Sequence, residues 1–309
     1  METIHEKKPP IAIALLLATT LLSLAGQPDG DAQIHSGGDS AIIITTTSRL
    51  AGAIGSLTWH GKEFINSYDH GRNLQSAASF DDTPKIGAET FNPTEAGSRD
   101  DFTGPHSTSR LLKITARDNY LYTRTQMAFW LAPGERSSGQ LARNTNALSD
   151  YLLTKKVTIG FKRWPQALDY RVTFTVPRGA RHVSAQYEAV TGYMPLEFDH
   201  FWHFDAAGGK LLPLSHGPGR FDGPVVLATA DGRYAMGVFG MPQKQRDTTG
   251  PLYGRWYIKE AQVVKWTCVY RVSNPHGIHN GNYTYRMLVP VGTLVQVQSM
   301  LRDWTKLYP

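Results

Sequence analysis

The sequence predicts an all-β fold, an antiparallel β-sandwich followed by one C-terminal helix. Segments rich in Val, Ile, Thr, Tyr and Phe recur along the chain with turn residues between them, and several alternate apolar with polar residues. Such alternation is typical of antiparallel sheets that face a core on one side. The one cysteine, Cys268, allows no internal disulfide. Stability must therefore come from a large apolar core, for which the hydrophobic content of 41% is sufficient.

The N-terminus has the pattern of a secretory signal peptide. Lys7 and Lys8 precede the apolar run 11–22, and small residues follow at Ser23 and Ala25. A membrane-spanning helix needs roughly 20 apolar residues, so this run is too short to be an anchor. We therefore expect a secreted or periplasmic protein without a stable membrane anchor after cleavage. The expected division is a signal peptide over 1–25, a flexible lead-in over 26–40 and a single β-sandwich domain over 41–309.

Eleven segments have clear strand character. In the segment 168–176, the apolar residues Leu168, Tyr170, Val172, Phe174 and Val176 alternate with polar ones, which predicts a strand with one buried face. The segments expected to form strands are 41–48, 53–59, 111–116, 120–131, 152–161, 168–176, 182–190, 225–230, 234–239, 263–272 and 283–289.

The C-terminal segment 294–306 has helical spacing. Val295, Met300, Leu301 and Trp304 can line one face of such a helix. We expect this face to pack on the sandwich.

One stretch carries a family resemblance. The run AGAIGSLTWHGKEFI, residues 51–65, resembles the opening hairpin of galactose mutarotase-like domains. The resemblance implies a β-supersandwich, a fold found in aldose epimerases, polysaccharide lyases and glycosidase accessory domains. The paired histidines of the epimerases have no match here, so simple mutarotase activity is not implied. The neighbouring run NSYDHGR, residues 66–72, resembles a bacterial family of exported proteins.

A turn directly after this hairpin concentrates reactive side chains. Asp69, His70, Arg72 and Asn73 surround Gly71, which lets the backbone adopt a positive φ and turn its neighbours toward one point. Histidine titrates near neutral pH, and arginine offers a planar fork to carboxylates or vicinal hydroxyls. We predict that Asp69 and His70 are catalytic and that Arg72 and Asn73 bind substrate. The alternative is a structural turn in which the aspartate caps backbone NH groups and pairs with the arginine.

A second candidate is the polar face of the strand 182–190. Gln186 and Glu188 lie on this face, and Tyr193 follows shortly after. A polar row opposite an apolar row indicates that one face meets water, which in a curved sandwich can be the ligand-holding face. Glu188 is the best single carboxylate for proton transfer, Tyr193 a second catalytic candidate and Gln186 a substrate ligand. The alternative is an ordinary solvated face.

The long polar loop 81–109 and several aromatic residues complete the candidate site. Loops of this length in compact domains are often functional. Within the loop, His106 is a further catalytic candidate and Glu95 a further substrate ligand, although such sequences also form plain turns. A sugar-binding platform with its polar neighbours is expected from Arg124, Gln126, Trp130 and Trp202.

Charge and motifs restrict the partners. The net charge is +6, but the Lys and Arg residues form no run of five or more, which favours an acidic partner, such as an anionic saccharide, over nucleic acid. His200 and His203 have the spacing of a metal pair on a helical turn, yet no other ligand pattern supports a metal, and a packed loop is the preferred interpretation. We predict no metal and no cofactor.

These features together predict an exported carbohydrate-active enzyme that uses acid–base chemistry. In a glycoside hydrolase, Asp69 and Glu188 would act as a carboxylate pair across the glycosidic bond. In a polysaccharide lyase, His70, His106 or Tyr193 would take a proton while Arg72 neutralises a uronate carboxylate. The alternative is a non-catalytic glycan-binding or cell-envelope module. Convergence of these side chains in one cleft would favour catalysis, and their scatter would favour binding.

Overall fold

The computed structural model describes residues 28–37, 42–83, 86–87, 89–243 and 247–308. All strand pairings among these residues are antiparallel, and one α-helix follows the last strand. The predicted fold class, an all-β sandwich with a C-terminal helix, is therefore confirmed. The expected signal peptide over 1–25 lies outside the described residues. Part of the expected lead-in is ordered instead, because residues 32–35 pair with the next strand.

The elements follow in chain order. The strands are β1 (Ala32–His35), β2 (Ile42–Thr46), β3 (Ile54–Trp59), β4 (Lys62–Glu63), β5 (Leu74–Asp81), β6 (Pro93–Thr94), β7 (Arg110–Arg117), β8 (Tyr120–Phe129), β9 (Arg136–Ser137), β10 (Gln140–Leu141), β11 (Leu148–Phe161), β12 (Trp164–Val176), β13 (Ser184–Pro195), β14 (His200–Asp205), β15 (Lys210–Leu214), β16 (Gly219–Phe221), β17 (Val225–Ala228), β18 (Ala235–Gly237), β19 (Phe239–Gly240), β20 (Thr248–Ile258), β21 (Val263–Ser273) and β22 (Gly281–Gly292). The helices are α1 (Leu294–Leu307) and the 3-10 turns η1 (Ser48–Leu50), η2 (Arg99–Asp101), η3 (Leu196–Phe198) and η4 (Lys259–Ala261).

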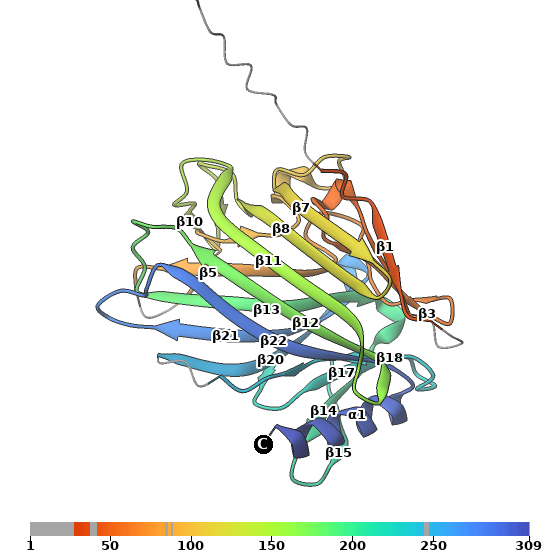
Figure 1. The fold of residues 1–309 in the computed structure, drawn as a ribbon. Coiled ribbons are helices and arrows are strands. Elements are labelled where there is room, and N and C mark those ends of the chain that lie inside the picture. Colours follow the sequence, from red (N-terminus) through yellow and green to blue (C-terminus); the bar gives the residue numbers. More distant parts are fainter. Residues whose placement is uncertain (1–27, 38–41, 84–85, 88, 244–246, 309) are drawn as a thin grey trace, which may run out of the picture.

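Two sets of long strands form the layers of the sandwich. One layer has the order β7–β8–β11–β12–β22, and the other has the order β5–β13–β21–β20–β16. Strands β1, β2 and β3 extend the second layer beyond β5, while the short β6 connects β5 to β8. The two sets cross at an angle in Figure 1. Each layer therefore has one face turned to the core and one turned outward.

Aromatic side chains fill the space between the layers. Tyr187 of β13 packs against Phe174 of β12, with ring centroids 4.9 Å apart, and Tyr270 of β21 stacks on Tyr285 of β22 at 4.3 Å. The five apolar residues that alternate through 168–176 are all buried, as their period predicts. The core thus fixes which face of each strand is left for polar side chains.

Helix α1 packs on a second apolar cluster beneath the sandwich (Figure 1). Met300, Leu301 and Trp304 are buried, as expected from the helical spacing, but Val295 is 74% exposed and Val297 takes its place. The helix begins after the capping residue Thr293, and the buried positions 297, 300, 301 and 304 form one face of it. No described helix is long and apolar enough to cross a membrane.

Some strands carry no clear sequence signal. The segment around His200 and His203 forms the strand β14 and not a helical turn or loop, so these two side chains point to opposite faces. Within the described residues, no three His, Cys, Asp or Glu side chains lie close enough to hold a metal ion. Strands β5, β16 and β20 were also not expected, and all three belong to the layer that carries the candidate site described next.

A candidate ionic site on the polar face of the second layer

The outward side of the β5–β13–β21–β20–β16 layer carries a row of polar side chains. A β-bulge in β13 between Glu188 and Val190 shifts the register, so that Glu188, Thr191 and Tyr193 all point outward although their spacing is not even. Strict alternation would have turned Tyr193 into the core. The bulge is thus what places a carboxylate and a phenol, both predicted as catalytic, on one face.

Lysine 265 of β21 lies at the centre of this face. Its Nζ is 3.4 Å from Glu188 Oε2, 4.9 Å from the centre of the Tyr193 ring and 5.0 Å from that of Trp256 on β20. Thr191 Oγ1 donates a 2.9 Å hydrogen bond to the same Glu188 oxygen. None of the hydrogen bonds found among the described residues reaches Glu188 Oε1. The carboxylate therefore keeps one oxygen for a ligand.

The pKa values of these groups are shifted in different directions. Burial raises the pKa of Glu188, but Lys265, the Thr191 hydrogen bond and Arg220 outweigh it, so the pKa ends below its usual range. Burial lowers the pKa of Lys265, but the charge of Glu188 and the contacts of Tyr193 reverse the effect and raise it. Burial also raises the pKa of Tyr193. At neutral pH the site thus holds an ionised carboxylate, an ammonium and a neutral phenol.

Two arginines extend the positive charge along the face. Arg271 of β21 donates to Gln186 Oε1 from Nε at 3.1 Å and from Nη2 at 2.9 Å, and Arg220 of β16 donates to the same oxygen at 3.3 Å. The pKa of Arg271 is lowered by burial and by the neighbouring Arg220. Gln186, predicted as a substrate ligand, therefore positions two guanidinium groups side by side. We call Gln186, Glu188, Tyr193, Arg220, Lys265 and Arg271 the Glu188 cluster.

A second carboxylate, Glu89, belongs to the same neighbourhood. It lies in the long loop that follows β5, where the residue as a whole is exposed but its carboxyl is partly withdrawn from water. Burial of the carboxyl raises its pKa, the negative charge of Glu188 raises it further, and Lys265 and Arg99 oppose these effects only in part. Glu89 and Glu188 thus have pKa values shifted in opposite directions. This divergence is the pattern of a proton donor and an ionised partner.

The turn after the first hairpin borders this face. Asp69 Oδ2 accepts from Arg72 Nε at 3.0 Å and from Nη2 at 2.6 Å, and Arg72 Nη1 donates to the Ala261 carbonyl at 2.7 Å. Gln75 Nε2 on the outward side of β5 donates to the Gly71 carbonyl at 2.7 Å. Asp69 and Arg72 thus pair with each other, as in the structural turn that was the alternative to a catalytic role.

Backbone groups hold the other two residues of the turn. His70 is buried, and its ring nitrogens lie 2.7 Å from the Phe102 carbonyl and 2.8 Å from the Arg49 carbonyl, so neither is free to face a substrate. Asn73 is also buried, and its Nδ2 donates to the His70 carbonyl at 3.2 Å. Gly71 has no positive φ. Its small size matters because a Cβ would lie 2.7 Å from Trp130 Cη2.

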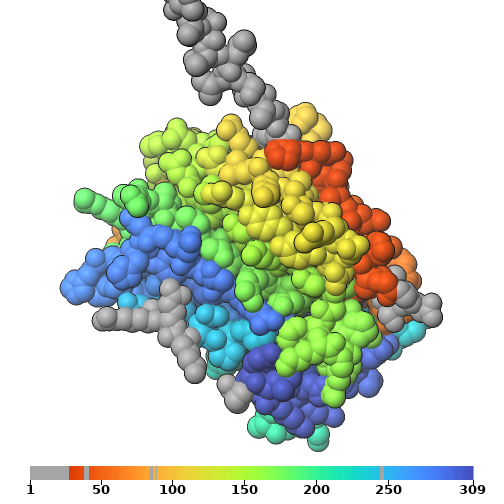
Figure 2. All heavy atoms as spheres, in the orientation of Figure 1, coloured from red at the N-terminus to blue at the C-terminus, as the bar shows by residue number. Residues whose placement is uncertain are grey.

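The remaining sequence candidates do not join the Glu188 cluster. Glu95 is fully buried in an ion pair with Lys155 inside the core, and Trp202 of β14 packs against the α1 cluster. His106 lines a small hollow next to Ser48 and Ser107. Arg124 lies on the outward side of the other layer. Strands β7 and β8 of that layer are turned to the viewer in Figure 1 and in Figure 2. Gln126 donates to the Ser149 carbonyl at 2.7 Å.

Trp130 is the one aromatic platform candidate near the turn. Its ring packs on Gly71, and its backbone pairs with Asn92 and Arg99. Five residues of this neighbourhood were not predicted as site residues from the sequence, namely Glu89, Arg220, Trp256, Lys265 and Arg271. For Lys265 and Arg271 a signal existed, since both alternate with the apolar residues of 263–272 in the same way as Gln186 and Glu188 do with theirs.

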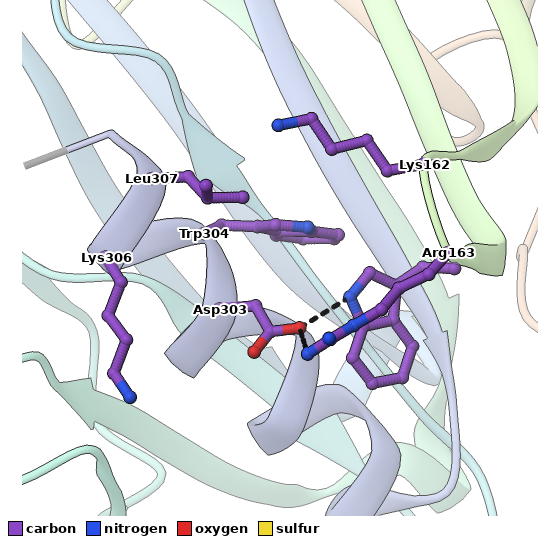
Figure 3. Close-up of a pocket in the computed structure, with 7 residues that line it drawn as sticks. Lys162, Arg163, Asp303, Trp304, Lys306 and Leu307 are labelled. Atoms are coloured by element: carbon purple, nitrogen blue, oxygen red, sulfur yellow. Dashed lines mark hydrogen bonds and ion pairs between the residues drawn. The ribbon is translucent and has the colours of Figure 1, made fainter.

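One apolar pocket lies elsewhere, between the β11–β12 turn and α1. Lys162, Arg163 and Trp164 face Asp303 and Trp304 across it, and Asp303 Oδ2 accepts from Trp164 Nε1 at 2.9 Å and pairs with Arg163 (Figure 3). The carboxylate is thus held by the turn that it faces. We interpret this pocket as part of the interface where α1 packs on the sheet.

The solved structures that resemble the chain share its sandwich fold. No family model and no curated protein matches the sequence. An α-mannosidase from Enterococcus faecalis matches with a TM-score of 0.53 and 11% identity, over 93% of this chain and 32% of its own. The Slr1438 protein from Synechocystis matches with a TM-score of 0.46 and 9% identity, over 87% of this chain and 99% of its own.

A third neighbour is the GH36 α-galactosidase AgaA from Geobacillus stearothermophilus, solved in complex with raffinose. It matches with a TM-score of 0.45 and 8% identity, over 87% of this chain and 42% of its own. The chain thus spans about a third of the mannosidase and less than half of the galactosidase. At 11% identity the likeness to the α-mannosidase shows the fold alone, an antiparallel β-sandwich.

Proposed function

We propose that this protein is an exported carbohydrate-active enzyme that cleaves an anionic poly- or oligosaccharide at the Glu188 cluster. One observation carries the proposal: the ionised Glu188 shares a face with three cationic side chains and two aromatic rings, and its charge acts on a second carboxylate, Glu89, whose pKa is shifted the opposite way. Sugar rings stack on aromatic side chains, and paired guanidinium groups bind carboxylates or sulfates. The sandwich shared with an α-mannosidase is compatible with such a role.

Hydrolysis fits these groups better than elimination. In hydrolysis, protonated Glu89 would give its proton to the leaving oxygen, and ionised Glu188 would either activate water or attack the anomeric carbon. Elimination needs a base that takes a proton next to a uronate carboxylate. The raised pKa values of Lys265 and Tyr193 keep both groups protonated, so they suit proton donation and charge stabilisation better than proton abstraction.

A polysaccharide panel tests the proposal. The purified protein is incubated with neutral, uronate-containing and sulfated polysaccharides, and both new reducing ends and the absorbance of unsaturated uronates are followed. We expect reducing ends from an anionic polymer without unsaturated products. Unsaturated products would show that the enzyme is a lyase and not a hydrolase. Binding without any product would show that the protein recognises the glycan without cleaving it.

The non-catalytic alternative has observations of its own, the first being that His70 and His106 do not converge with Glu188 in one cleft. Lys265 and Thr191 both contact Glu188, and the lowered pKa makes this carboxylate a weak base. A glycan-binding module needs only the arginines and aromatic rings of this face. Such a module would bind the anionic polymer with the same affinity after Glu188 is made neutral.

The pH dependence of hydrolysis follows from the two carboxylates. Glu188 must be ionised, so the rate falls as pH drops through its pKa, which lies below the ordinary 4.5. Glu89 must be protonated, so the rate falls again as pH rises through its pKa, which lies above 4.5. We therefore expect a bell-shaped profile of kcat/KM with an acidic optimum.

An aryl glycoside serves as the control for this profile, because its leaving group departs without a proton. We expect the fall on the alkaline side to disappear with that substrate. An optimum above neutral pH with the natural polymer would show that Glu89 is not the proton donor.

Export is the remaining part of the proposal. The basic residues, the short apolar run and the small residues near Ala25 support cleavage before Gly26. We expect N-terminal sequencing of the protein recovered outside the cytoplasm to begin near Gly26. Recovery of chains that begin at Met1 would contradict it.

A further inference from the structure

A second polar pocket lies at one end of the sandwich. Two adjoining cavities of 460 and 760 Å³ share the residues Asp82, Arg181 and His182, which stand at the end of β5 and before the start of β13. Volumes of this size are ordinary for small-ligand sites. None of the residues of the Glu188 cluster lines either cavity, so the pocket is a separate feature of the molecule.

A chain of polar contacts forms the base of the pocket. His182 is buried, and its Nε2 lies 2.5 Å from the Tyr151 hydroxyl. Asp82 accepts a 2.7 Å hydrogen bond from Arg143, which also donates to the Phe80 carbonyl at 2.5 Å. Burial lowers the pKa of His182 more than Asp82 raises it, and burial raises the pKa of Tyr151. Histidine and tyrosine are therefore both neutral at pH 7.

Two buried atoms at this base lack hydrogen-bond partners. His182 Nδ1 has only Asp82 Oδ1 at 3.5 Å, beyond good hydrogen-bond geometry, and Asn144 Oδ1 has none among the described residues. Because the Tyr151 hydroxyl can donate to Nε2, the hydrogen of the neutral imidazole belongs on Nδ1. The pocket then offers one donor with only a long contact to Asp82 and one acceptor without a partner among the described residues. Hydroxyl groups of a ligand, which donate and accept, suit both atoms.

The side chains on the walls and at the mouth of the pocket indicate which other chemical groups a ligand would have. The rings of Phe91 and Phe129 lie 4.6 Å apart and line the pocket, and the Arg143 guanidinium lies over the Phe91 ring, 5.6 Å from its centre. Arg178 and Arg181, on the turn between β12 and β13, are exposed, and neither forms an ion pair with another described residue. Asp82 is already paired with Arg143. The two free guanidinium groups therefore leave the mouth positive and suited to an anion.

We propose that this pocket is a second saccharide site that binds an acidic sugar unit, with its carboxylate or sulfate on Arg178 and Arg181. The hydroxyl groups of the unit meet His182 Nδ1 and Asn144 Oδ1. This inference does not depend on catalysis at the Glu188 cluster. A protein with no hydrolytic activity would still bind the sugar at this end.

Calorimetric titration with trigalacturonate tests the site, with the neutral trisaccharide maltotriose and inorganic sulfate as comparison ligands. The protein used carries Arg220→Ala, which weakens the Glu188 cluster and leaves the second pocket intact. We expect saturable binding of trigalacturonate, and at least tenfold weaker binding after Arg178→Ala and Arg181→Ala are introduced together. Tyr151→Phe, which removes one hydroxyl and keeps the ring, should weaken binding without changing the anion dependence.

The matched control is the double variant Arg110→Ala and Arg117→Ala on β7, which loses the same charge away from the pocket. Its affinity should equal that of the Arg220→Ala protein. Equal losses in both double variants would mean that net charge alone attracts the ligand and would overturn the site. Binding of maltotriose as tight as that of trigalacturonate, or no saturable binding at all, would overturn it as well. If inorganic sulfate alone displaced trigalacturonate completely, the pocket would be a simple anion site, and the saccharide assignment would be wrong.

Discussion

The Glu188→Gln variant is expected to lose roughly 10² to 10⁴ in turnover on the substrate identified by the panel. Such a loss corresponds to about 3 to 5 kcal/mol of activation free energy. The physical reason is that glutamine keeps the shape and the Thr191 contact but can neither attack the anomeric carbon nor take a proton from water. The KM should change little, because the arginines and aromatic rings that bind the sugar are untouched.

The fold should survive this change. Glu188 keeps 24% of its side chain exposed, and Lys265 retains its contacts with the rings of Tyr193 and Trp256 after the carboxylate is neutralised. Partly exposed ion pairs contribute only about 1 kcal/mol or less. We therefore expect urea unfolding to shift by about that amount.

Glu197→Gln is the matched control for activity. Glu197 also pairs with a lysine, Lys62, but its side chain is 51% exposed and it lies in the 3-10 turn beyond the end of β13. Its turnover should equal that of the wild type. Full activity of Glu188→Gln would exclude the carboxylate from the chemistry, and a variant that does not fold would make Glu188 a structural residue.

The layers of the fold could be predicted from the sequence because local alternation determines them. The buried positions of β12 follow directly from the period of two. The strand β14 could not be recognised in the same way, because its histidines and aromatic residues also fit a helical turn. Strand β5, with the sequence LQSAASFD, carries small residues whose burial depends on neighbours from distant parts of the chain.

The candidate site was only partly predictable for the same reason. Glu188 was found because its strand has a polar face, and Tyr193 shares that face only because of a bulge that alternation does not predict. Glu89 became a candidate through its proximity to Glu188, which the sequence separates by almost a hundred residues. The charged turn at Asp69 was conspicuous, yet most of its polar atoms hold the turn and its neighbours together.

Glu95 shows why residue type alone is a weak guide to function. A glutamate in a long polar loop suggests a ligand for substrate, but this one turns inward and neither it nor Lys155 of β11 has any side-chain exposure. Ser76 donates its backbone NH to Glu95 Oε2 at 3.1 Å, and Lys155 Nζ lies 5.9 Å from the centre of the Tyr170 ring. The pair thus connects the loop, β5 and β11 inside the core.

Breaking this buried pair should have the largest effect on stability. Lys155→Met leaves the Glu95 carboxylate in the core with the Ser76 NH as its one remaining partner among the described residues. An uncompensated buried charge costs about 3 to 5 kcal/mol. We expect urea unfolding at neutral pH to show a loss of unfolding free energy of that size.

The double variant Glu95→Gln and Lys155→Met removes both charges and should recover most of this loss. Lys156→Met, an exposed neighbour on the same strand, should stay within about 0.5 kcal/mol of the wild type. Two results would show that the ion pair does not hold the loop against the core. One is a Lys155→Met variant as stable as Lys156→Met, and the other is a double variant no more stable than Lys155→Met alone.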